Sequence, residues 1–383
     1  MKISGSWINR PASQAVCAML TEAGHQALFV GGCVRNDLLH EPVGDIDIAT
    51  DARPETVIEL AGKAGFKPVP TGVEHGTITV VAHGLPHEIT TFRKDVETHG
   101  RHATVAFSTE VAEDARRRDF TMNALYATAD GAVLDPLDGL GDLKARRVRF
   151  IDDAGQRIRE DYLRILRFFR FHAWYGDPAG GLDSDGLAAV AAHLDGLKGL
   201  SRERVGAEII KLLAAPDPAP SVAAMRAAGV MTVVLPGADD RLLAPLVYLE
   251  SHTDTGPDPL RRLACLGGGD PKELLRLSKA QARQLDLLRS EIALARTPAE
   301  LGYRFGADAA RDIVLLRAAM SGQPISERHL KDIDQGAGVT FPIAASDLMQ
   351  EYSGPALGAR LRLLEQRWID SGFVLTRDAL LNR

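Results

Sequence analysis

The stretch Leu28–Thr50, LFVGGCVRNDLLHEPVGDIDIAT, decides how the first part of this 383-residue chain is expected to fold. An apolar run leads into the glycine pair Gly31-Gly32, which predicts a strand followed by a tight turn. Asp45 and Asp47 follow after a short spacer, two residues apart in a β-prone segment. Because side chains alternate along a strand, both carboxylates should lie on one face while the isoleucines beside them face the core.

Two carboxylates aimed at the same water repel each other, so a strand that displays them beside a glycine turn favours a divalent-cation site next to a phosphate site. Mg²⁺ that bridges protein carboxylates and substrate phosphates is typical of nucleotidyl transfer. Taken alone, a Gly-Gly pair is usually a turn and an Asp-x-Asp is usually a solvated strand end, but the combination favours the metal site. A dinucleotide-binding fold needs a third glycine opening a helix. It is excluded here because the next glycine is Gly44.

The composition, with 45% hydrophobic and 25% charged residues, predicts a globular protein of two to four domains. No apolar run approaches the length of a membrane span, and the N-terminal segment shows no signal-peptide pattern. Cys17, Cys33 and Cys265 are scattered without a C-x-x-C spacing, which argues against a disulfide framework or a zinc site. We therefore expect a cytoplasmic protein without a membrane partner.

The net charge of −6 argues against an indiscriminate nucleic-acid binder. One segment has the opposite sign, since residues 146–170 hold eight Arg against four Asp and Glu. Such a basic stripe on an acidic protein predicts one bounded site for phosphates.

The order of patterns predicts an α+β protein with a mixed-sheet head over residues 1–145, a helical segment over 146–215 and a helical remainder over 222–383. The expected strands are 27–34, 45–49, 77–82, 86–92, 103–107 and a hairpin over 123–135 with an Asp-Gly turn signal. Helices are expected over 53–64, 157–175 and 201–214, and the Pro-rich segment 215–221 reads as a linker.

Glu88 lies in PHEITTF, a strand that should follow 77–82 through a short turn. A neighbouring strand could bring Glu88 to the face of Asp45 and Asp47 as a third carboxylate, although an inert surface glutamate is the more frequent situation. The charged and glycine-broken stretch 94–102 is expected to be a mobile loop, and an inert hairpin connection fits it equally well.

The segment RRRDFTMNALY, residues 116–126, places polar groups at the edge of an apolar run. Three consecutive arginines are usually a solvated face. Here they precede Asp119, and Asn123 is polar amid apolar neighbours. Because polar groups at a core edge tend to have committed partners, a ribose and a triphosphate are candidate partners for this segment.

The segment REDYLRILRFFRFHAWYG, residues 159–176, carries Asp161, Arg164, Arg167 and Arg170 at a strict three-residue step. An ordinary helix pair between Glu160 and Arg164 is one interpretation. The other is that the Asp161 carboxylate and the Arg164 guanidinium read a base edge that presents an amino donor beside a ring-nitrogen acceptor. Cytosine and adenine present that order and uracil and guanine the reverse, so wrong bases would leave polar groups mispaired.

The segment GLSRERVGAEIIKLL, residues 199–213, is predicted to begin a helix at Ser201 and to pair Arg204 with Glu208. We expect a structural role for it, buttressing the preceding helix.

With these motifs in view, the chain resembles the class II tRNA nucleotidyltransferases, the CCA-adding enzymes, to which bacterial poly(A) polymerase is closely related. GGCVRN with DID, RRDFTMNAL, DPLDGLGDL (135–143), EDYLRILRFFRF and SRERVGAE occur in the family's order over roughly residues 25–213. The resemblance implies a polymerase-β-like head followed by a helical neck, body and tail, with the body and tail binding tRNA.

The resemblance also implies roles for single residues. Asp45 and Asp47 would hold Mg²⁺, with Glu88 as a less secure third carboxylate. The triphosphate and ribose contacts would be Gly32, Arg35, Arg118 and Asp119, with Asn123 nearby. The base-reading pair would be Asp161 and Arg164, with Arg167 and Arg170 beside them. The expected substrates are CTP, ATP and tRNA, and the oligomeric state is left open.

The sequence departs from the family pattern at one position: the family usually has Asp after the motif arginine, whereas this chain has Asn36 followed by Asp37. No His-Asp dipeptide occurs, which argues against an appended phosphohydrolase domain of that type. Poly(A) polymerase, a CC-only or A-only enzyme and a non-enzymatic RNA-binding module remain as alternatives. The sequence pI of about 6.0 argues against the first, and the intact acidic pair argues against the last.

Overall fold

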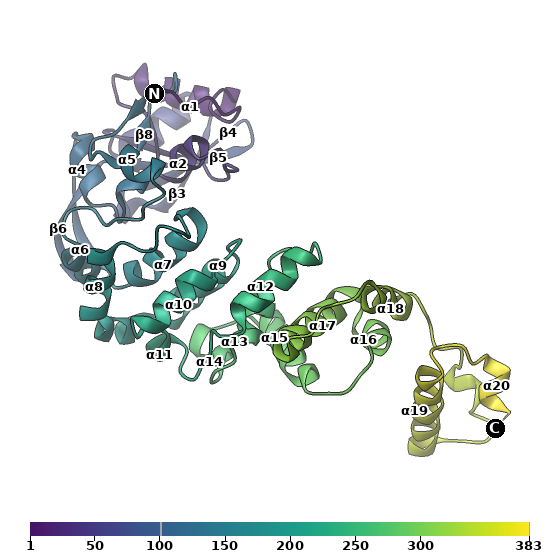
Figure 1. Cartoon of the computed structure of the whole chain (residues 1–383). Coiled ribbons are helices and arrows are strands. Elements are labelled where there is room, and N and C mark those ends of the chain that lie inside the picture. The colour runs from purple at the N-terminus through teal and green to yellow at the C-terminus, as the bar shows by residue number, and fades with distance from the viewer. Residues whose placement is uncertain (100–101, 383) are drawn as a thin grey trace. The chain divides into compact units, whose positions relative to one another are not determined.

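The computed structural model describes residues 1–99 and 102–382, and the side chains of 1–94 and 106–382. It divides into two compact units, Met1–Pro236 and Gly237–Arg383. The first unit carries the strands followed by helices, and the described part of the second unit is built from helices (Figure 1). The Pro-rich segment 215–221, which was predicted to be a linker, lies inside the first unit, and helix α10 begins within it at Ala219.

The first unit is organised around a mixed sheet. Its strands, with those of a separate hairpin, are β1 Leu28–Val30, β2 Asp47–Thr50, β3 Lys67–Gly72, β4 Thr77–Ala82, β5 Leu85–Thr91, β6 Arg93–His99, β7 His102–Phe107, β8 Tyr126–Ala127 and β9 Val133–Leu134. The seven-stranded sheet has the order β3-β4-β5-β2-β1-β8-β9, and β6 pairs with β7. Strands β2 and β5 run parallel, while the other paired strands run antiparallel. This mixed topology places β2 and β5 side by side at the middle of the sheet.

The helices divide between the two units. In the first unit they are α1 Pro11–Thr21, α2 Gly32–Leu38, α3 Pro54–Lys63, α4 Val111–Arg116, α5 Gly139–Lys144, α6 Ala154–Glu160, α7 Leu163–Tyr175, α8 Ser184–Ala192, α9 Arg202–Leu213, α10 Ala219–Ala227 and α11 Val230–Val234. In the second unit they are α12 Leu243–His252, α13 Pro259–Leu266, α14 Pro271–Leu275, α15 Lys279–Ile292, α16 Pro298–Phe305, α17 Ala307–Ser321, α18 Glu327–Ala337, α19 Gly354–Asp370 and α20 Arg377–Leu381. Short 3-10 turns lie at η1 Val73–His75, η2 Thr121–Asn123, η3 Leu194–Gly199 and η4 Ala345–Asp347.

Apolar side chains fix the sheet against its helices. Helices α1 and α3 pack on strands β4 and β5. A hydrophobic core cluster of the first unit is formed by buried side chains of Leu28, Val30, Ala49, Phe92, Ala115, Ala124, Tyr126 and Ile151. The alternation predicted around the acidic pair is confirmed, since Ile46 and Ile48 are buried while Asp45 is exposed.

An aromatic cluster joins the sheet region to helix α7. Phe120, just before η2, has its ring centroid 4.9 Å from that of Phe171 on α7 and 5.0 Å from that of Phe150. Phe150 in turn stacks on Phe168 at 5.3 Å. Large buried aromatics contribute much of the packing energy of a core. The arginines of α7 are therefore held at a fixed place beside the sheet.

The α+β class with a mixed-sheet head is confirmed, and no strand follows Leu134 in the described residues. Several local predictions were wrong. The strand expected over 27–34 ends at Val30, and α2 begins two residues later. The helix expected over 157–175 is broken between α6 and α7 at Asp161. The loop expected over 94–102 is largely strand, apart from 100–101, which lie outside the described residues.

The second unit is held in part by a buried ionic cluster. Arg261 and Arg262 on α13 are 2% and 1% exposed, and both bind the carboxylate of Glu250 on α12. Arg261 also donates to Asp312 on α17 at 2.6 Å. Nearer the C-terminus, Trp368 packs with apolar residues of α19 and α20. Among the described residues, no helix combines the length and the apolar character needed to cross a bilayer.

Candidate active site

The glycine turn after β1 brings residues of the later RRRDFTMN segment close to it. Gly31 has φ 71°, a left-handed conformation that favours glycine. A Cβ at Gly31 would lie 3.4 Å from Nη1 of Arg118 and 3.6 Å from the side-chain oxygen of Asn123. Gly32 then begins α2, and a Cβ there would meet only Nη2 of Arg35 at 3.8 Å. The turn therefore lies next to two arginines, and half-buried Gly32 has no side chain that would keep a ligand away from its backbone.

The predicted carboxylates gather at the start of β2. Asp47 is the first residue of β2 and lies opposite Glu88 of β5 in the parallel register. Burial, followed by the nearby charges of Glu88 and Asp45, raises the pKa of Asp47 to about 6, while Arg118 opposes the rise. The charges of Glu88 and Asp45 therefore act on the Asp47 carboxylate.

This acidic group fits a divalent cation that a substrate helps to hold. In the described part of the chain, no three His, Cys, Asp or Glu side chains form a closed metal-binding set. Mg²⁺ usually takes one or two protein carboxylates and completes its shell with phosphate oxygens and water. The mutual repulsion seen at Asp47 is what a cation would relieve, so Asp45 and Asp47 suit such a site, with Glu88 beside them.

The carboxylate of Asp114 holds the Arg118 guanidinium at this site. It donates to Oδ2 of Asp114 at 3.0 Å and to the hydroxyl of Tyr126 at 3.1 Å. Although burial acts in the opposite direction, Arg118 and Arg117 lower the pKa of Asp114 to about 2. Arg118 is therefore fixed between a permanent anion on one side and the glycine turn on the other.

A hydrogen-bonded chain links α2, η2 and α7. Nη1 of Arg35 donates to Oδ1 of Asn123 at 2.8 Å, and Nδ2 of Asn123 donates to Oδ1 of Asp119 at 3.1 Å. Oδ2 of Asp119 accepts from Nε of Arg167 at 2.6 Å. Burial opposes ionisation of Asp119, yet Arg167 and Asn123 lower its pKa to about 2. Hydrogen bonds therefore connect four residues predicted for the site, in the order Arg35, Asn123, Asp119 and Arg167.

Arg35 lies deeper than a surface phosphate contact. It is 5% exposed, and its guanidinium lies 3.9 Å from the ring centroid of Tyr175. Its Nε and Nη2 donate to Oδ1 of Asn36, at 3.1 and 2.8 Å. Burial, the largest influence, lowers the pKa of Arg35. Arg35 thus lies buried next to the glycine turn, on the side away from solvent.

The departure from the family motif has a structural account. Asn36 supplies the acceptor for Arg35 and donates to the carbonyl of Pro42 at 2.8 Å. Asp37 turns away and binds the N-terminal segment, accepting from the backbone N–H of Gly5 at 2.8 Å and from Nε1 of Trp7 at 2.6 Å. Asp37 therefore anchors the N-terminal segment.

The base-reading pair expected on one helix lies at the break between α6 and α7. Asp161 has an extended backbone, φ −151° and ψ 105°, and its Oδ1 accepts from the N–H of Leu163 at 3.1 Å. Arg164 donates to Oε2 of Glu160 at 2.6 Å and to the carbonyl of Arg117 at 2.9 Å. The Glu160–Arg164 ion pair, which the sequence offered as the structural interpretation, is thus present, but it spans the break between α6 and α7.

The predicted pairing on α9 was wrong. Glu208 accepts from Nε of Arg170 on α7 at 2.5 Å, and Arg204 donates to Oδ2 of Asp161 at 2.6 Å. Both ion pairs join α9 to the α6–α7 segment. The segment does buttress its neighbour, through contacts between helices.

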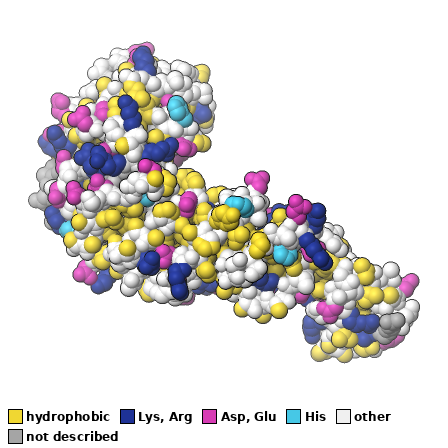
Figure 2. Space-filling view, viewed as in Figure 1, with side chains coloured by type: hydrophobic (Ala, Val, Ile, Leu, Met, Phe, Trp, Pro, Cys, Tyr) yellow, Lys and Arg dark blue, Asp and Glu magenta, His cyan; other side chains and the backbone are white. Residues whose placement is uncertain are grey.

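The arginines of segment 146–170 are largely paired with carboxylates. Arg147 and Arg149 both bind Asp142, with side chains 55% and 42% exposed. Figure 2 shows Lys and Arg side chains gathered where the strands of the first unit meet its helices, with Asp and Glu side chains close by. The stripe is therefore a set of oriented ion pairs whose outer members remain open to water.

Sequence reasoning missed the contacts of Asp114 with Arg118 and of Arg204 with Asp161. Asp114 on α4 lies four residues before Arg118, which follows the end of that helix, and this i, i+4 spacing was a signal that could have found the contact. The partner of Arg204 is 43 residues away in sequence, and no local spacing indicates it.

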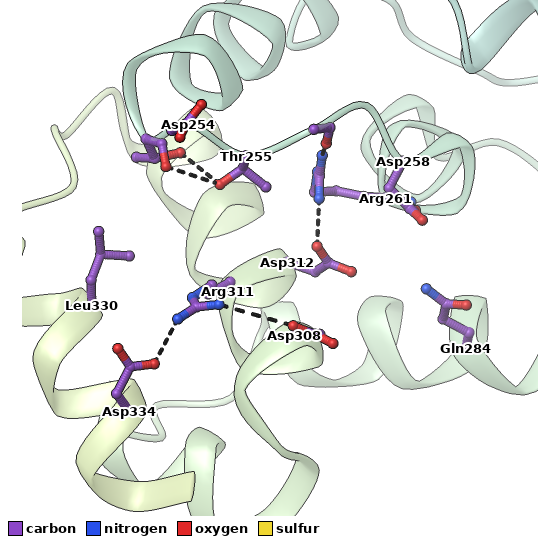
Figure 3. Close-up of a pocket in the computed structure, with 12 residues that line it drawn as sticks. Asp254, Thr255, Asp258, Arg261, Gln284, Asp308, Arg311, Asp312, Leu330 and Asp334 are labelled. Carbon is purple, nitrogen blue, oxygen red and sulfur yellow. Dashed lines mark hydrogen bonds and ion pairs between the residues drawn. The ribbon is translucent and has the colours of Figure 1, made fainter.

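A cavity of about 700 Å³ in the second unit lies among α12 to α18 and is a poor candidate for a nucleotide site. Figure 3 shows that aspartates outnumber arginines along it, and that Arg261 is bound to Asp312 and Arg311 to Asp334. Phosphates would be repelled there. The chemistry therefore belongs to the first unit.

The fold and the site together define a nucleotidyltransferase: a mixed sheet carries an acidic pair next to a glycine turn, and a helical segment with paired arginines follows. Comparison with known proteins agrees. Residues 27–149 match the family described as poly A polymerase head domain, and residues 182–242 match the probable RNA and SrmB-binding site of polymerase A.

The full-length comparisons narrow the class. The chain is 31% identical over 402 residues to the human mitochondrial CCA tRNA nucleotidyltransferase 1, covering 96% of this chain and 88% of the relative. It is 34% identical over 375 residues to the CCA-adding enzyme of Streptococcus pyogenes, covering 91% and 90%. The crystal structure of the Bacillus stearothermophilus CCA-adding enzyme in complex with CTP superposes with a TM-score of 0.77 at 27% identity, covering 94% and 92%. This chain belongs to the class II CCA-adding tRNA nucleotidyltransferase family.

Proposed function

We propose that this protein adds C, C and A in turn to the 3′ ends of tRNA, taking the nucleotides from CTP and ATP and releasing pyrophosphate. The observation that carries the proposal is the presence, in one compact unit, of the Asp45/Asp47 acidic pair and of the Asp161/Arg164 pair. The first pair supports phosphate chemistry and the second supports base selection. Relatives whose names record CCA addition support the same conclusion.

In the proposed reaction, the 3′-hydroxyl of tRNA attacks the α-phosphate of the nucleotide, and pyrophosphate leaves. Asp45 and Asp47 would hold two Mg²⁺ ions, with Glu88 adding negative charge next to them. When bound, Mg²⁺ supplies activation of the hydroxyl and charge stabilisation of the leaving phosphates. The protein itself contributes mainly by positioning its groups and stabilising charge.

The triphosphate would lie over the Gly31-Gly32 turn. Gly32 permits close approach of the backbone, and Arg118 is held beside the turn by Asp114. Arg35, buried below, would add positive charge to the same place, since the side chains that accept its hydrogen bonds there are the neutral amides Asn36 and Asn123. Asp119, bound by Arg167, would accept from the ribose hydroxyl, while Arg170 fixes α7 through Glu208.

Base selection would use the groups that Asp161 and Arg164 leave available. A carboxylate oxygen has two lone pairs, so Oδ2 of Asp161 can accept from an exocyclic amino group while it binds Arg204. Arg164 uses three N–H groups for Glu160 and two carbonyls. Among the described residues its Nε–H makes no hydrogen bond and could donate to the adjacent ring nitrogen. Cytosine and adenine match this order, while uracil and guanine do not.

The helical residues 222–383 are proposed to bind the body of the tRNA, with the head and neck, residues 1–145 and 146–215, receiving its 3′ end. Because phosphate contacts dominate such binding, it should weaken as salt rises. We also propose a cytoplasmic location for this protein, whereas the human relative carries a mitochondrial name.

Purified protein with Mg²⁺, a tRNA transcript lacking CCA and each labelled nucleotide in turn tests this proposal. CTP alone should add two residues, and ATP should add one residue only after them. A CC-only enzyme would stop before A, an A-only enzyme would need a tRNA that already ends in CC, and a poly(A) polymerase would extend an unrelated RNA with many A residues. Any of these three outcomes would contradict the proposal.

A further inference from the structure

Asp161 depends on tertiary contacts for its orientation, because it lies outside both helices. Its backbone is extended, so helical hydrogen bonds on either side do not fix its side chain. Two contacts hold the carboxylate: the N–H of Leu163 reaches Oδ1 at 3.1 Å, and Nη2 of Arg204 reaches Oδ2 at 2.6 Å. The first contact comes from the start of α7, and the second comes from α9.

The position of Arg204 is fixed by helix α9, which is well packed. Helix α9 buries Val205, Ile209 and Leu212, and it packs directly on α7. A second ion pair, between Arg170 and Glu208, ties the same two helices together. The position of Arg204 relative to Asp161 is therefore set by packing over the length of α9.

The Asp161–Arg204 pair borders a hollow that a ligand can enter. The hollow measures about 500 Å³ and is lined by Tyr162, Gly196 and Ser201 besides the pair itself. The two side chains are 27% and 29% exposed, so water reaches both. Gly196 lets the Tyr162 ring close one wall, since a Cβ there would lie 1.9 Å from a ring carbon.

We propose that Arg204 is a positioning residue for base selection: by binding Oδ2, it holds the Asp161 carboxylate in the one orientation that can accept from the amino group of cytosine or adenine. This inference rests on the proposed function and adds a residue to it. Arg204 acts through Asp161 and touches neither the phosphates nor the reacting atoms. Without Arg204, the contact at Oδ1 is what remains on the Asp161 carboxylate among the described residues.

A purely structural role for Arg204 would have a different signature. Exposed or partly exposed ion pairs contribute little to stability, so loss of the pair alone should leave the fold intact. A role in fold stability would lower the amount of active enzyme and slow all nucleotides equally. A role in orientation changes the ratio between nucleotides, because a loosened carboxylate no longer rejects a carbonyl group effectively.

The test compares Arg204→Gln and Arg204→Lys with Lys211→Gln, which removes a positive charge from the exposed face of the same helix. For each protein, kcat/KM is measured for CTP, ATP, UTP and GTP on a tRNA lacking CCA. Equilibrium binding of CTP and UTP in Mg²⁺ without tRNA gives a second readout that does not need turnover. Thermal melting checks the fold of each variant.

We expect Arg204→Gln to lower the preference for CTP over UTP roughly threefold to tenfold, part of what a good bidentate contact supplies. Arg204→Lys should recover much of the preference, and Lys211→Gln should match the wild type. If Arg204→Gln slows all four nucleotides equally and leaves the binding ratio unchanged, the inference is overturned while CCA addition stands. If the wild type itself adds no C or A, the proposed function and this inference fall together.

Discussion

Replacing Asp47 by asparagine should stabilise the protein while it removes activity. Asp47 is partly buried next to Glu88 and Asp45, and its pKa is raised from 3.8 to about 6. Above pH 6 the wild type must therefore hold an unfavourable negative charge in the folded state, which the unfolded chain holds freely in water. An asparagine side chain at this position would carry no charge, so the Asp47→Asn variant avoids this destabilisation.

The magnitude follows from the pKa. Each pKa unit corresponds to about 1.4 kcal/mol, so the rise of about two units sets an upper limit of roughly 3 kcal/mol. Because water still reaches the carboxylate, we expect a gain of about 1 to 2 kcal/mol at pH 8. Near pH 4 the folded carboxyl is already protonated and carries no charge, so the gain from the substitution should disappear.

Urea denaturation of wild type and Asp47→Asn at pH 8 and pH 4, without Mg²⁺, measures this directly. Asp45→Asn is the comparison variant, since it removes an exposed carboxylate and should give a smaller gain. Added Mg²⁺ should stabilise the wild type and have little effect on Asp47→Asn. Equal stability of wild type and variant at pH 8, or a gain that persists unchanged at pH 4, would refute the electrostatic reasoning.

Four further substitutions test three separate parts of the site and fold. Gly32→Val should raise KM for CTP and ATP by similar factors, because phosphates carry no base identity; an effect on one nucleotide alone would place residue 32 near the base. Asp161→Ala and Arg164→Ala should relax rejection of UTP and GTP by roughly tenfold to a hundredfold, measured by incorporation of all four nucleotides; an unchanged preference would leave both residues with a structural role alone. Glu250→Gln should destabilise the second unit by about 3 to 5 kcal/mol, because it leaves two buried arginines without their shared carboxylate; urea denaturation showing no more change than an exposed Glu327→Gln would contradict this.

The centre of the head was predictable because its signals are local. The alternation around Asp45 and Asp47 predicted which side chains face the core, and the Gly31-Gly32 pair predicted the turn. Strand β3, Lys67–Gly72, escaped prediction because it contains two prolines, which disfavour strands. It occurs at the edge of the sheet, where a missing N–H is tolerated.

The contacts between segments were beyond local patterns. The sequence of residues 157–175 has a continuous helical pattern, yet the helix is interrupted at Asp161. There, Arg204 and the N–H of Leu163 hold the Asp161 carboxylate. Arg35 was expected at a phosphate, and its burial arises from Asn123 and Tyr175, which lie far along the chain. Such long-range partners determine which polar atoms of a side chain remain available to a ligand. The spacing of residues in the sequence does not reveal these partners.

The central claim is that one acidic pair performs the transfer of both C and A while other residues choose the base. It is tested by single-turnover addition to a tRNA lacking CCA, using Asp45→Ala and Asp47→Ala with CTP and then, on a tRNA ending in CC, with ATP. We predict that each variant loses transfer of both nucleotides and still binds tRNA as tightly as the wild type. Near wild-type transfer of either nucleotide by either variant in Mg²⁺ would contradict the account.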